Sequence, residues 1–447
     1  MRIALQHLFY LLHLVVKLTE PRIMKKLLAT ALLSLSVFAA SAQQKTLSAP
    51  VQSFKDYTAE LEKDRQEASG NKNYLRADTL LKQWVRRYDI LPDSVKPQFK
   101  SWEPGMYYNI ACYEALQGKK DAALNSFEKC VALGYGNYNN TIADTDLESL
   151  RKEKRYLIAL QTLRERGDKA YILRQSGAYD RKVNKEIPAF TYQHASSPEL
   201  IAFKTKYNLD SVAGKGDEIT RMKNLLFWVH NAVRHDGSSN NPPSKNGTDL
   251  IEICKKENRG VNCRMMATIL KDAYQAEGFK ARMVTCLPKD TLDNDCHVIN
   301  IVWSDNLNKW IWMDPTFNAY VSDKNGNLLS IEEVRAKLHA DKLNDLVLNP
   351  DANWNNKNKQ TKEYYLGYYM SKNLYWLQCS TKSEWNIETR TSNKAVIDYV
   401  NLYPGGYNTI KEPKVSNRYM TSYATNNPQL FWQKPVINKD NKLAVVQ

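Results

Sequence analysis

The chain has 447 residues, of which 43% are hydrophobic, and a formal net charge of +15. This length predicts two or three domains with packed cores. Acidic residues are interspersed with the basic excess, and no zinc-finger or RNA-binding motif accompanies it, which argues against a nucleic-acid partner. Contact with anionic polymers of a cell envelope, or simple solubility, fits this composition better.

The N-terminal region has the three parts of a secretory signal. It begins with a basic Met-Lys-Lys start at Met24, continues with an apolar run over 27–40, and ends in small residues before a cleavage site near Ala42. Residues 1–42 are therefore expected to be an over-extended start plus a signal peptide; an unusually long leader is the alternative. No other run is long and apolar enough to cross a membrane, so the mature protein is expected to be secreted or periplasmic.

Residues 43–170 are predicted to form a helical domain, because apolar residues recur with helical period from residue 51 onward. The stretch 107–134 predicts two short helices around a turn at Gly118, with small residues where the helices cross. This pair is similar to one tetratricopeptide-type repeat, and a further helix is expected over 146–164. A single repeat is not a stable array, so the region is either a groove that recruits a protein partner or, as we favour, a helical spacer.

A Gly-, Asp-, Arg- and Lys-rich segment, 166–190, is predicted to join this region to a second domain at 186–345. Ser197 and Pro198 are typical residues of a helix start. Another helix is expected from Glu218 to Val233. It should pack beneath the helix that follows the polar loop 235–248, and such loops often shape a cleft.

Cys263 stands at the start of that next helix. Asn262 is a good N-cap residue, apolar side chains from Cys263 to Tyr274 recur at helical spacing, and Gly278 provides the stop. In the first turn, the helix dipole and the unpaired backbone amides favour the thiolate, which is the form of cysteine that attacks a carbonyl. The same amides suit a developing oxyanion.

His297 and Asp314 lie on a predicted hairpin. His297 begins an apolar strand, a turn-forming run follows over 304–309, and the second strand ends at Asp314. A two-residue loop places His297 opposite Asp314 and a four-residue loop makes them diagonal neighbours; in both registers their side chains share a face. Asp314 is then suited to orient the imidazole, and the imidazole to take the proton of Cys263. The approach of Cys263 to His297 does not follow from spacing.

Four features agree in order and spacing with a known family: Cys263 at a helix start after Gly260, the run 278–282, His297 opening a strand, and Asp314-Pro315 closing the next one. Over roughly 217–335 the chain resembles the transglutaminase-like superfamily, a papain-like thiol fold. The resemblance implies an α+β core with a cysteine-bearing helix packed on an antiparallel sheet. It also implies a nucleophile at Cys263, a general base and acid at His297, and an orienting carboxylate at Asp314.

The chain departs from the family at one position. Many bacterial members carry an acidic residue two positions after the cysteine, where this chain has Met265. The acidic loops of the calcium-dependent animal members are also missing, so no cofactor and no metal are expected.

Residues 346–447 are predicted to form a β-rich extension. Aromatic and polar side chains alternate between 363 and 432, as in 364–369, and Asn, Gly and Pro interrupt them. These strands either extend the sheet of the core or form a small separate domain. Their aromatic residues fit cross-strand pairs better than a surface for stacking sugars or peptides.

The seven cysteines are an odd count. With Cys263 free, the other six can pair in 15 ways, and Cys286 with Cys296 is the least strained pairing because it closes a short loop. A zinc site is disfavoured, since the intervals between its candidate ligands lack the short paired spacing of zinc knuckles. Those ligands would be Cys254, Cys263, Cys286, Cys296 and His297. Asp295 is a weaker orienting residue than Asp314, and the other histidines, His235 among them, have no comparable partners in sequence.

The sequence therefore predicts an exported thiol enzyme that acts on carboxamide or peptide bonds through an acyl-enzyme intermediate. Water would make it a peptidase or amidase, and a lysine amine would make it a cross-linker; no residue decides between them. A protein or peptide substrate is expected, with cell-envelope peptides as candidates. The alternative is a silent fold that serves as a binding or scaffold module in the envelope.

Overall fold

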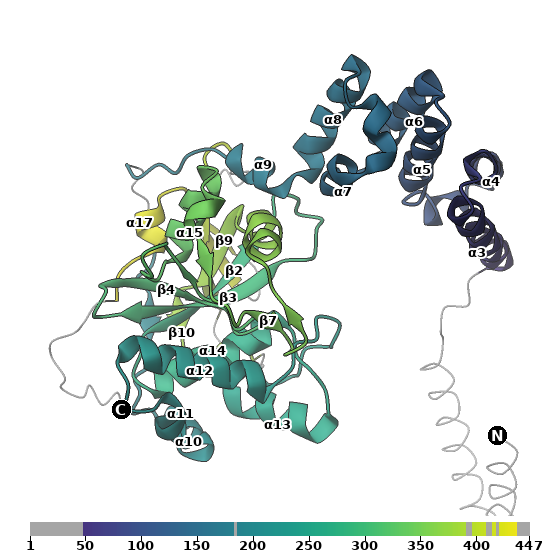
Figure 1. Cartoon of the computed structure of the whole chain (residues 1–447). Coiled ribbons are helices and arrows are strands. Elements are labelled where there is room, and N and C mark those ends of the chain that lie inside the picture. The colour runs from purple at the N-terminus through teal and green to yellow at the C-terminus, as the bar shows by residue number, and fades with distance from the viewer. Residues whose placement is uncertain (1–47, 183–185, 390–395, 408–413, 417–419, 436–447) are drawn as a thin grey trace, which may run out of the picture. The chain divides into compact units, whose positions relative to one another are not determined.

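The computed structural model describes residues 48–182, 186–389, 396–407, 414–416 and 420–435, so the predicted signal segment lies outside the described residues. The chain divides into two compact units, which Figure 1 shows with their elements labelled. The helical unit extends to Tyr135 and includes Thr145–Tyr156, and the sheet unit comprises Gly136–Asp144 and the chain from Leu157 onward. The predicted domain boundaries differ in detail and stay predictions. Across the described ranges, no helix has both the length and the apolar character that a bilayer span requires.

The helical unit is built on four long helices: α3 (Ala49–Gly70), α4 (Tyr74–Asp89), α5 (Glu103–Leu116) and α6 (Lys120–Ala132). A short 3-10 helix, η1 (Lys96–Gln98), connects α4 to α5. Phe54, Trp84 and Phe99 are buried in the core, where the Trp84 indole donates to the Thr58 hydroxyl at 2.9 Å. The turn between α5 and α6 has Gly118 at a φ of +73°, a conformation that favours glycine. That this pair is a tetratricopeptide repeat stays a prediction.

The helix expected over 146–164 is divided. A 3-10 helix, η2 (Thr145–Leu150), precedes α8 (Lys154–Gly167), and a turn bond from the Glu153 N–H to the Leu150 oxygen at 2.9 Å separates them. Two short helices, α7 (Tyr138–Ala143) and α9 (Lys169–Arg174), flank this region. The segment 166–190 is more than a join, because Leu173 of α9 is fully buried in the core of the sheet unit.

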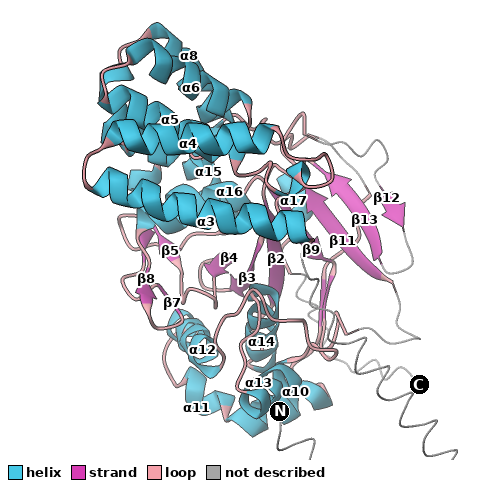
Figure 2. Ribbon diagram, turned by 90° about the vertical axis from the view of Figure 1, so that its right-hand side faces the viewer, coloured by secondary structure: helices cyan, strands magenta, loops and turns pink. Residues whose placement is uncertain are grey.

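The sheet unit contains a seven-stranded sheet. Its strands, in spatial order, are β12 (Lys414–Ser416), β13 (Met420–Thr425), β11 (Ile397–Leu402), β9 (Trp376–Ser380), β2 (Ala281–Leu287), β3 (His297–Ser304) and β4 (Lys309–Met313). Figure 2 shows this order across the unit. All neighbours are antiparallel except β11 and β13. The C-terminal strands therefore extend the sheet of the core, which was the first of the two predicted arrangements.

Helices cover both faces of the central strands (Figure 1). One face carries α10 (Pro198–Tyr207), α11 (Leu209–Ala213), α12 (Glu218–Ala232), α13 (Gly247–Glu257) and α14 (Cys263–Ala276). The other face carries α15 (Ile331–His339), the π-helix η4 (Glu363–Met370) and α17 (Pro428–Phe431). Strand alternation divides the side chains, since the paired Val302 and Ile311 face the first group and the paired Ile301 and Trp312 face the second.

Short elements complete the sheet unit. Three two-stranded pairs are present: β1 (Thr191–Tyr192) with β10 (Lys382–Ser383), β5 (Val321–Ser322) with β6 (Val347–Leu348), and β7 (Asn353–Trp354) with β8 (Asn358–Lys359). A 3-10 helix, η3 (Leu343–Asp345), and a single helical turn, α16 (Ser371–Asn373), lie between them in the chain.

The prediction of extended structure for residues 364–369 is wrong. These residues lie in η4, whose first turn is held by the Tyr365 N–H donating to the Thr361 oxygen at 2.9 Å. Tyr364 and Tyr368 stack on each other at 5.9 Å on the exposed side, whereas Tyr365 is fully buried. Aromatic residues spaced four apart thus mark two sides of a helix rather than cross-strand pairs.

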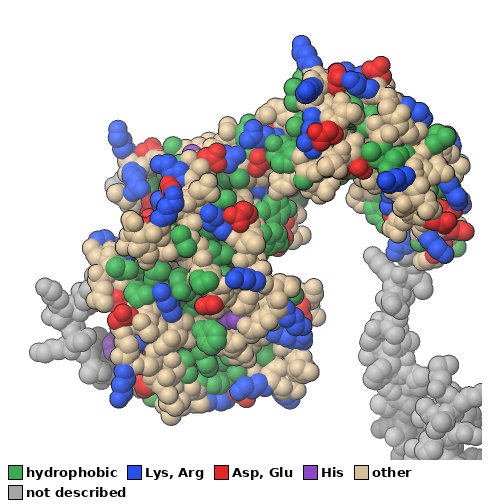
Figure 3. All heavy atoms as spheres, viewed as in Figure 1, with side chains coloured by type: hydrophobic (Ala, Val, Ile, Leu, Met, Phe, Trp, Pro, Cys, Tyr) green, Lys and Arg blue, Asp and Glu red, His purple; other side chains and the backbone are tan. Residues whose placement is uncertain are grey.

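Charges of both signs are mixed on one face of the molecule. On the face shown in Figure 3, Lys and Arg side chains are interspersed with Asp and Glu on both units, and the described residues on that face form no continuous basic surface.

Candidate functional site

The β3–β4 hairpin closes with the four-residue loop, because Ser304 pairs with Lys309. His297 and Asp314 are therefore diagonal neighbours on one face, as that register predicts. His297 Nε2 and Asp314 Oδ2 lie 2.7 Å apart, and both side chains are almost completely buried. Because Nε2 is engaged by the carboxylate, Nδ1 is the nitrogen left for the thiol.

Asp314 is held by two further hydrogen bonds. Its Oδ2 accepts from the Tyr365 hydroxyl at 2.6 Å, and its Oδ1 accepts from the Thr316 N–H at 2.9 Å. Burial raises the pKa of Tyr365 well above its ordinary value, so this hydroxyl remains a donor. Tyr365 was not predicted as a site residue, because it reaches Asp314 from η4, 51 positions further along the chain.

Two aromatic rings confine the His297 imidazole. Phe317 lies with its ring centroid 5.5 Å away in an edge-to-face arrangement, and Tyr369 lies 5.3 Å away on η4. These contacts restrict the rotation of the imidazole and exclude water from its faces. The imidazole is therefore fixed in the orientation that the Asp314 bond requires.

Cys263 begins α14, as predicted, and Asn262 caps the helix by accepting from the Met265 N–H at 3.1 Å. Its thiol is partly exposed and contacts His297, whose approach could not be derived from spacing. Burial raises the pKa of Cys263, but hydrogen bonds from His235 and His297, the charge of His297 and the Val298 amide outweigh this effect and lower the pKa to about 6.

His297 shows the complementary shift. Burial lowers its pKa, but the charge and hydrogen bond of Asp314, together with the contact to Cys263, raise it to about 10. Between these two values, the thiolate and the imidazolium coexist. This ion pair is the reactive form of a cysteine nucleophile.

The sequence model of the transglutaminase-like superfamily matches residues 205–315, a range that contains Cys263, His297 and Asp314. Residues 205–315 form a transglutaminase-like domain. A solved chain from Cytophaga hutchinsonii, described as a "Putative Cysteine Protease", is similar at 17% sequence identity and a TM-score of 0.22. The similar region covers 33% of this chain and 46% of that chain. The match thus spans less than half the length of that protein. No curated protein matches the chain.

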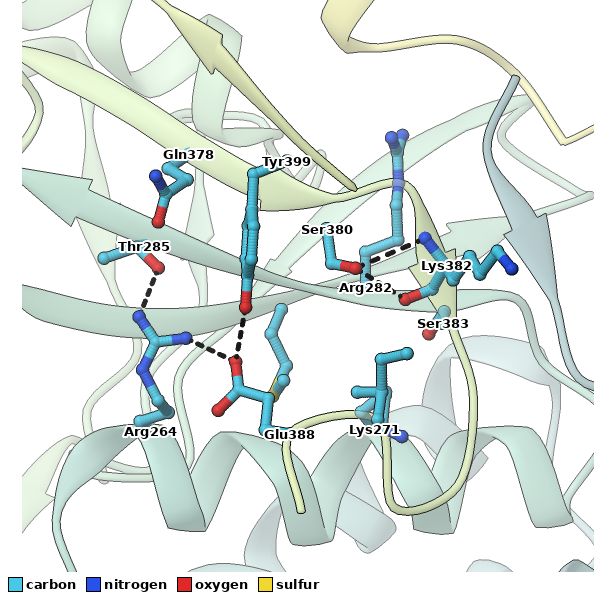
Figure 4. A pocket seen from close by; sticks show the side chains of 12 residues that line it. Arg264, Lys271, Arg282, Thr285, Gln378, Ser380, Lys382, Ser383, Glu388 and Tyr399 are labelled. Carbon is cyan, nitrogen blue, oxygen red and sulfur yellow. Dashed lines mark hydrogen bonds and ion pairs between the residues drawn. The ribbon is translucent and has the colours of Figure 1, made fainter. Parts of the chain in front are cut away.

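The start of α14 in the transglutaminase-like domain is fixed by Arg264, the residue after the cysteine. Its guanidinium donates to Thr285 Oγ1 on β2 at 2.8 Å and to Glu388 Oε1 at 2.7 Å. Figure 4 shows this arrangement, with Tyr399 donating to the same carboxylate at 3.3 Å. Met265, where bacterial members often carry an acid, is fully buried, so Arg264 rather than residue 265 makes the polar contacts of the helix start.

His235, which the sequence analysis set aside, is part of the site. It follows α12 at the start of the polar loop, and its side chain helps to lower the pKa of Cys263. The Trp354 indole contacts its other ring nitrogen, Nδ1, at 3.1 Å. One feature of the sequence could have indicated His235 as a site residue: it stands at the start of the loop that precedes the segment with Cys263.

The pairing of Cys286 with Cys296, the least strained one by sequence, is wrong, because both thiols are free. Cys286 pairs across the sheet with His297 and is fully buried. Cys296 lies outside β3, in the loop that precedes it, where its N–H donates to the Asn294 oxygen at 3.0 Å. Cys296 is partly exposed like Cys263, but burial raises its pKa. Asp295, the weaker candidate for orienting His297, binds Lys372 at 2.9 Å instead.

A cleft of about 590 Å³ opens beside the transglutaminase-like domain. Its aromatic walls include Phe317 and Tyr369, the two rings that confine His297, and Trp354, which contacts His235. Tyr364 adds an exposed ring, and Asp295 and Lys359 add charge. We call this space the aromatic cleft. Its walls thus share rings with the surroundings of both imidazoles.

Proposed function

We propose that this protein is a thiol hydrolase or acyltransferase that acts on carboxamide or peptide bonds. The observation that supports this most directly is the contact between Cys263 and His297, which favours the thiolate and imidazolium at neutral pH. The buried Asp314 orients the imidazole from its other nitrogen. The transglutaminase-like match over 205–315 supports the same chemistry.

In the proposed reaction, the Cys263 sulfur attacks the carbonyl carbon, a C–S bond forms, and the carbonyl oxygen takes the negative charge. The C–N bond then breaks, and the His297 imidazolium gives its proton to the departing nitrogen, which leaves a thioester and a free amine. Water or a second amine next attacks the thioester and gives its proton to His297. The C–S bond breaks, the sulfur leaves as thiolate, and the ion pair is restored.

The aromatic cleft is the proposed site for a substrate side chain next to the reacting bond. Its volume of about 590 Å³ lies within the range of about 300–1,000 Å³ that is typical of ligand sites. Its rings favour an apolar or aromatic side chain, because such a group gains most from leaving water among other rings. A peptide or protein substrate would supply this group together with the carboxamide.

We further propose that the protein acts outside the cytoplasm on cell-envelope peptides, with the helical unit available to a protein partner. The basic start, apolar run and small residues up to Ala42 support export. The mass of the mature protein recovered from the periplasm or medium tests this. A start at Gln43 is expected, and an unprocessed cytoplasmic chain would contradict export.

Mass spectrometry of envelope peptides incubated with the native protein and with Cys263→Ala tests the reaction. Hydrolysis adds water across a bond, deamidation replaces an amide nitrogen with oxygen, and amine transfer joins two molecules with loss of ammonia. We expect one of these changes with the native protein and a loss of more than about a thousandfold in Cys263→Ala.

The matched control is Cys296→Ala, because that thiol is also partly exposed and lies next to the site. It should retain the native rate. Full activity in Cys263→Ala would contradict the proposal, and unchanged peptides with every protein would favour a silent scaffold.

A further inference from the structure

His235 is held beside the segment that leads into Cys263. The Asp236 N–H donates to the Val261 oxygen at 2.8 Å, and His235 itself forms a parallel bridge with Val261. Gly260 permits this close approach, because a Cβ there would lie 2.6 Å from the Cβ of Asp236. The backbone at His235 and Asp236 is thus fixed against Gly260 and Val261, just before α14 begins.

The end of β7 and the residue after it fix His235 from another direction. Asn355 binds both sides of its peptide backbone: Asn355 Oδ1 accepts from the His235 N–H at 2.7 Å, and Asn355 Nδ2 donates to the His235 oxygen at 2.9 Å. The residue before it, Trp354, has its indole N–H 3.1 Å from His235 Nδ1. Backbone and side chain are therefore positioned by one short segment.

The indole determines which proton the imidazole carries. A tryptophan Nε1–H can only donate, so Nδ1 of His235 must accept and cannot itself be protonated. In this state the imidazole is neutral, and its single proton resides on Nε2. Nδ1 is occupied and Nε2 already has a proton, so His235 cannot take a proton from the thiol while this bond exists. It can only donate from Nε2. The bridge to Val261 holds His235 beside the residues that lead into Cys263, and its side chain helps to lower the pKa of that thiol.

We propose that His235, held neutral and Nε2-protonated by Trp354, is the side-chain donor that stabilises the oxyanion formed when Cys263 attacks a carbonyl. In that step the carbonyl carbon becomes bonded to the sulfur, so the charged oxygen develops beside the side chain that already acts on the sulfur. The Cys263 backbone amide, in the first turn of α14, supplies the second donor. The two imidazoles then have separate roles, since His297 transfers protons and His235 keeps its own.

This inference rests on the proposed acyl-transfer function, so its test separates the two. The probe for acylation is 4-nitrophenyl acetate, and the probe for the thiolate is iodoacetamide. Alkylation by iodoacetamide is substitution at a saturated carbon and forms no oxyanion. A donor that serves the oxyanion therefore affects acylation far more than alkylation.

Full-length native, His235→Ala and His235→Gln proteins are compared at pH 8, above the pKa of Cys263. We expect His235→Ala to acylate about a hundred- to a thousandfold more slowly than native protein and to alkylate within about fivefold of it. His235→Gln keeps an N–H donor and should recover most of the acylation rate. Native acylation by His235→Ala, or an equal loss in both reactions, would overturn the inference.

The tautomer is tested without altering the site, by ¹⁵N NMR of the native protein labelled at histidine. We expect one His235 nitrogen to be unprotonated and one protonated, and we expect Trp354→Phe to change that pattern while the protein stays folded. Two protonated nitrogens in the native protein would overturn the proposal. Native protein that alkylates but never acylates would contradict the proposed function, whereas native acylation by His235→Ala contradicts only the role of His235.

Discussion

Two stretches of the sheet unit supply most of the candidate site, and they contribute to it in different ways. Residues 262–314 supply the thiol, the imidazole and the carboxylate, each at the end of a regular element. Residues 353–370 supply none of these groups. They instead provide Tyr365 to Asp314, Tyr369 to the ring of His297, and Trp354 to His235.

The first stretch supplies the reacting groups, and the second stretch positions them. A nucleophile at a helix start and a histidine at a strand start are determined by local geometry, so they occupy recognisable places in a sequence. The groups that fix rotamers and tautomers come from distant segments, and their spacing in the chain carries no information about the contact. Variants in the second stretch should therefore change rates and pKa values without removing the reacting groups.

The largest effect in this comparison is expected from Asp314→Asn, which keeps the shape of the side chain but removes its charge. Without the carboxylate, the pKa of His297 falls and the pKa of Cys263 rises, so less thiolate is present at pH 7. We expect acylation by 4-nitrophenyl acetate at pH 7 to fall by about a hundredfold or more. Stopped-flow release of nitrophenolate measures this rate.

Asp295→Asn is the matched control, because Asp295 is close in sequence to His297 but binds Lys372. It should stay within about threefold of native protein. Equal losses in the two variants would mean that general charge near the site, rather than the contact of Asp314 with His297, determines the rate.

A smaller effect is expected from Tyr365→Phe in the second stretch. This change removes one of the three hydrogen bonds to Asp314. The buried Oδ2 of Asp314 then keeps only its bond with His297. We expect the free energy of unfolding to fall by about 1–3 kcal/mol and acylation to slow by about tenfold. Urea denaturation and the same nitrophenolate assay measure the two quantities.

Tyr364→Phe provides the comparison, since Tyr364 is the exposed neighbour on η4. Its free energy of unfolding should stay within about 0.5 kcal/mol of the native value. If both variants behave alike, the Tyr365 hydroxyl has no positioning role.

Much of the first stretch could be predicted from sequence. Asn262 and the apolar period located the cysteine helix, and strand alternation put His297 and Asp314 on one face. The loop length of the hairpin stayed open between two registers, because both keep the apolar side chains inside. The sequence also showed that Cys263 and His297 belong to separate elements, but only packing of α14 on β3 brings them into contact.

The second stretch was predicted wrongly for a physical reason. Its aromatic residues were interpreted as cross-strand pairs because tyrosine is common in strands. Tyr364 and Tyr368 are four apart, as are Tyr365 and Tyr369, and this spacing is helical. His235 was missed because its partners, Trp354 and Asn355, lie about 120 residues away. No local pattern identifies such a contact.

The smallest effect is expected at the rim of the aromatic cleft. Tyr364→Ala removes an exposed ring that lines the cleft. Tyr368→Ala removes the ring that stacks on Tyr364 but does not line the cleft. For a peptide with an aromatic residue next to the reacting bond, we expect Tyr364→Ala to raise KM by about threefold to tenfold and leave kcat close to native. Tyr368→Ala should change KM less, and equal changes would place the substrate side chain elsewhere.

The most direct test of the central claim, an ion pair between Cys263 and His297, is the pH dependence of Cys263 alkylation by iodoacetamide in the full-length protein. The extent of alkylation at each cysteine is measured by mass spectrometry of the peptide that contains it, with Cys296 as the internal reference thiol. Because the pKa of Cys263 is lowered to about 6, its rate should be half-maximal near pH 6, while Cys296 stays slow until well above neutrality. His297→Ala should move the Cys263 midpoint upward. A Cys263 midpoint near that of an ordinary thiol, unmoved by His297→Ala, would contradict the account.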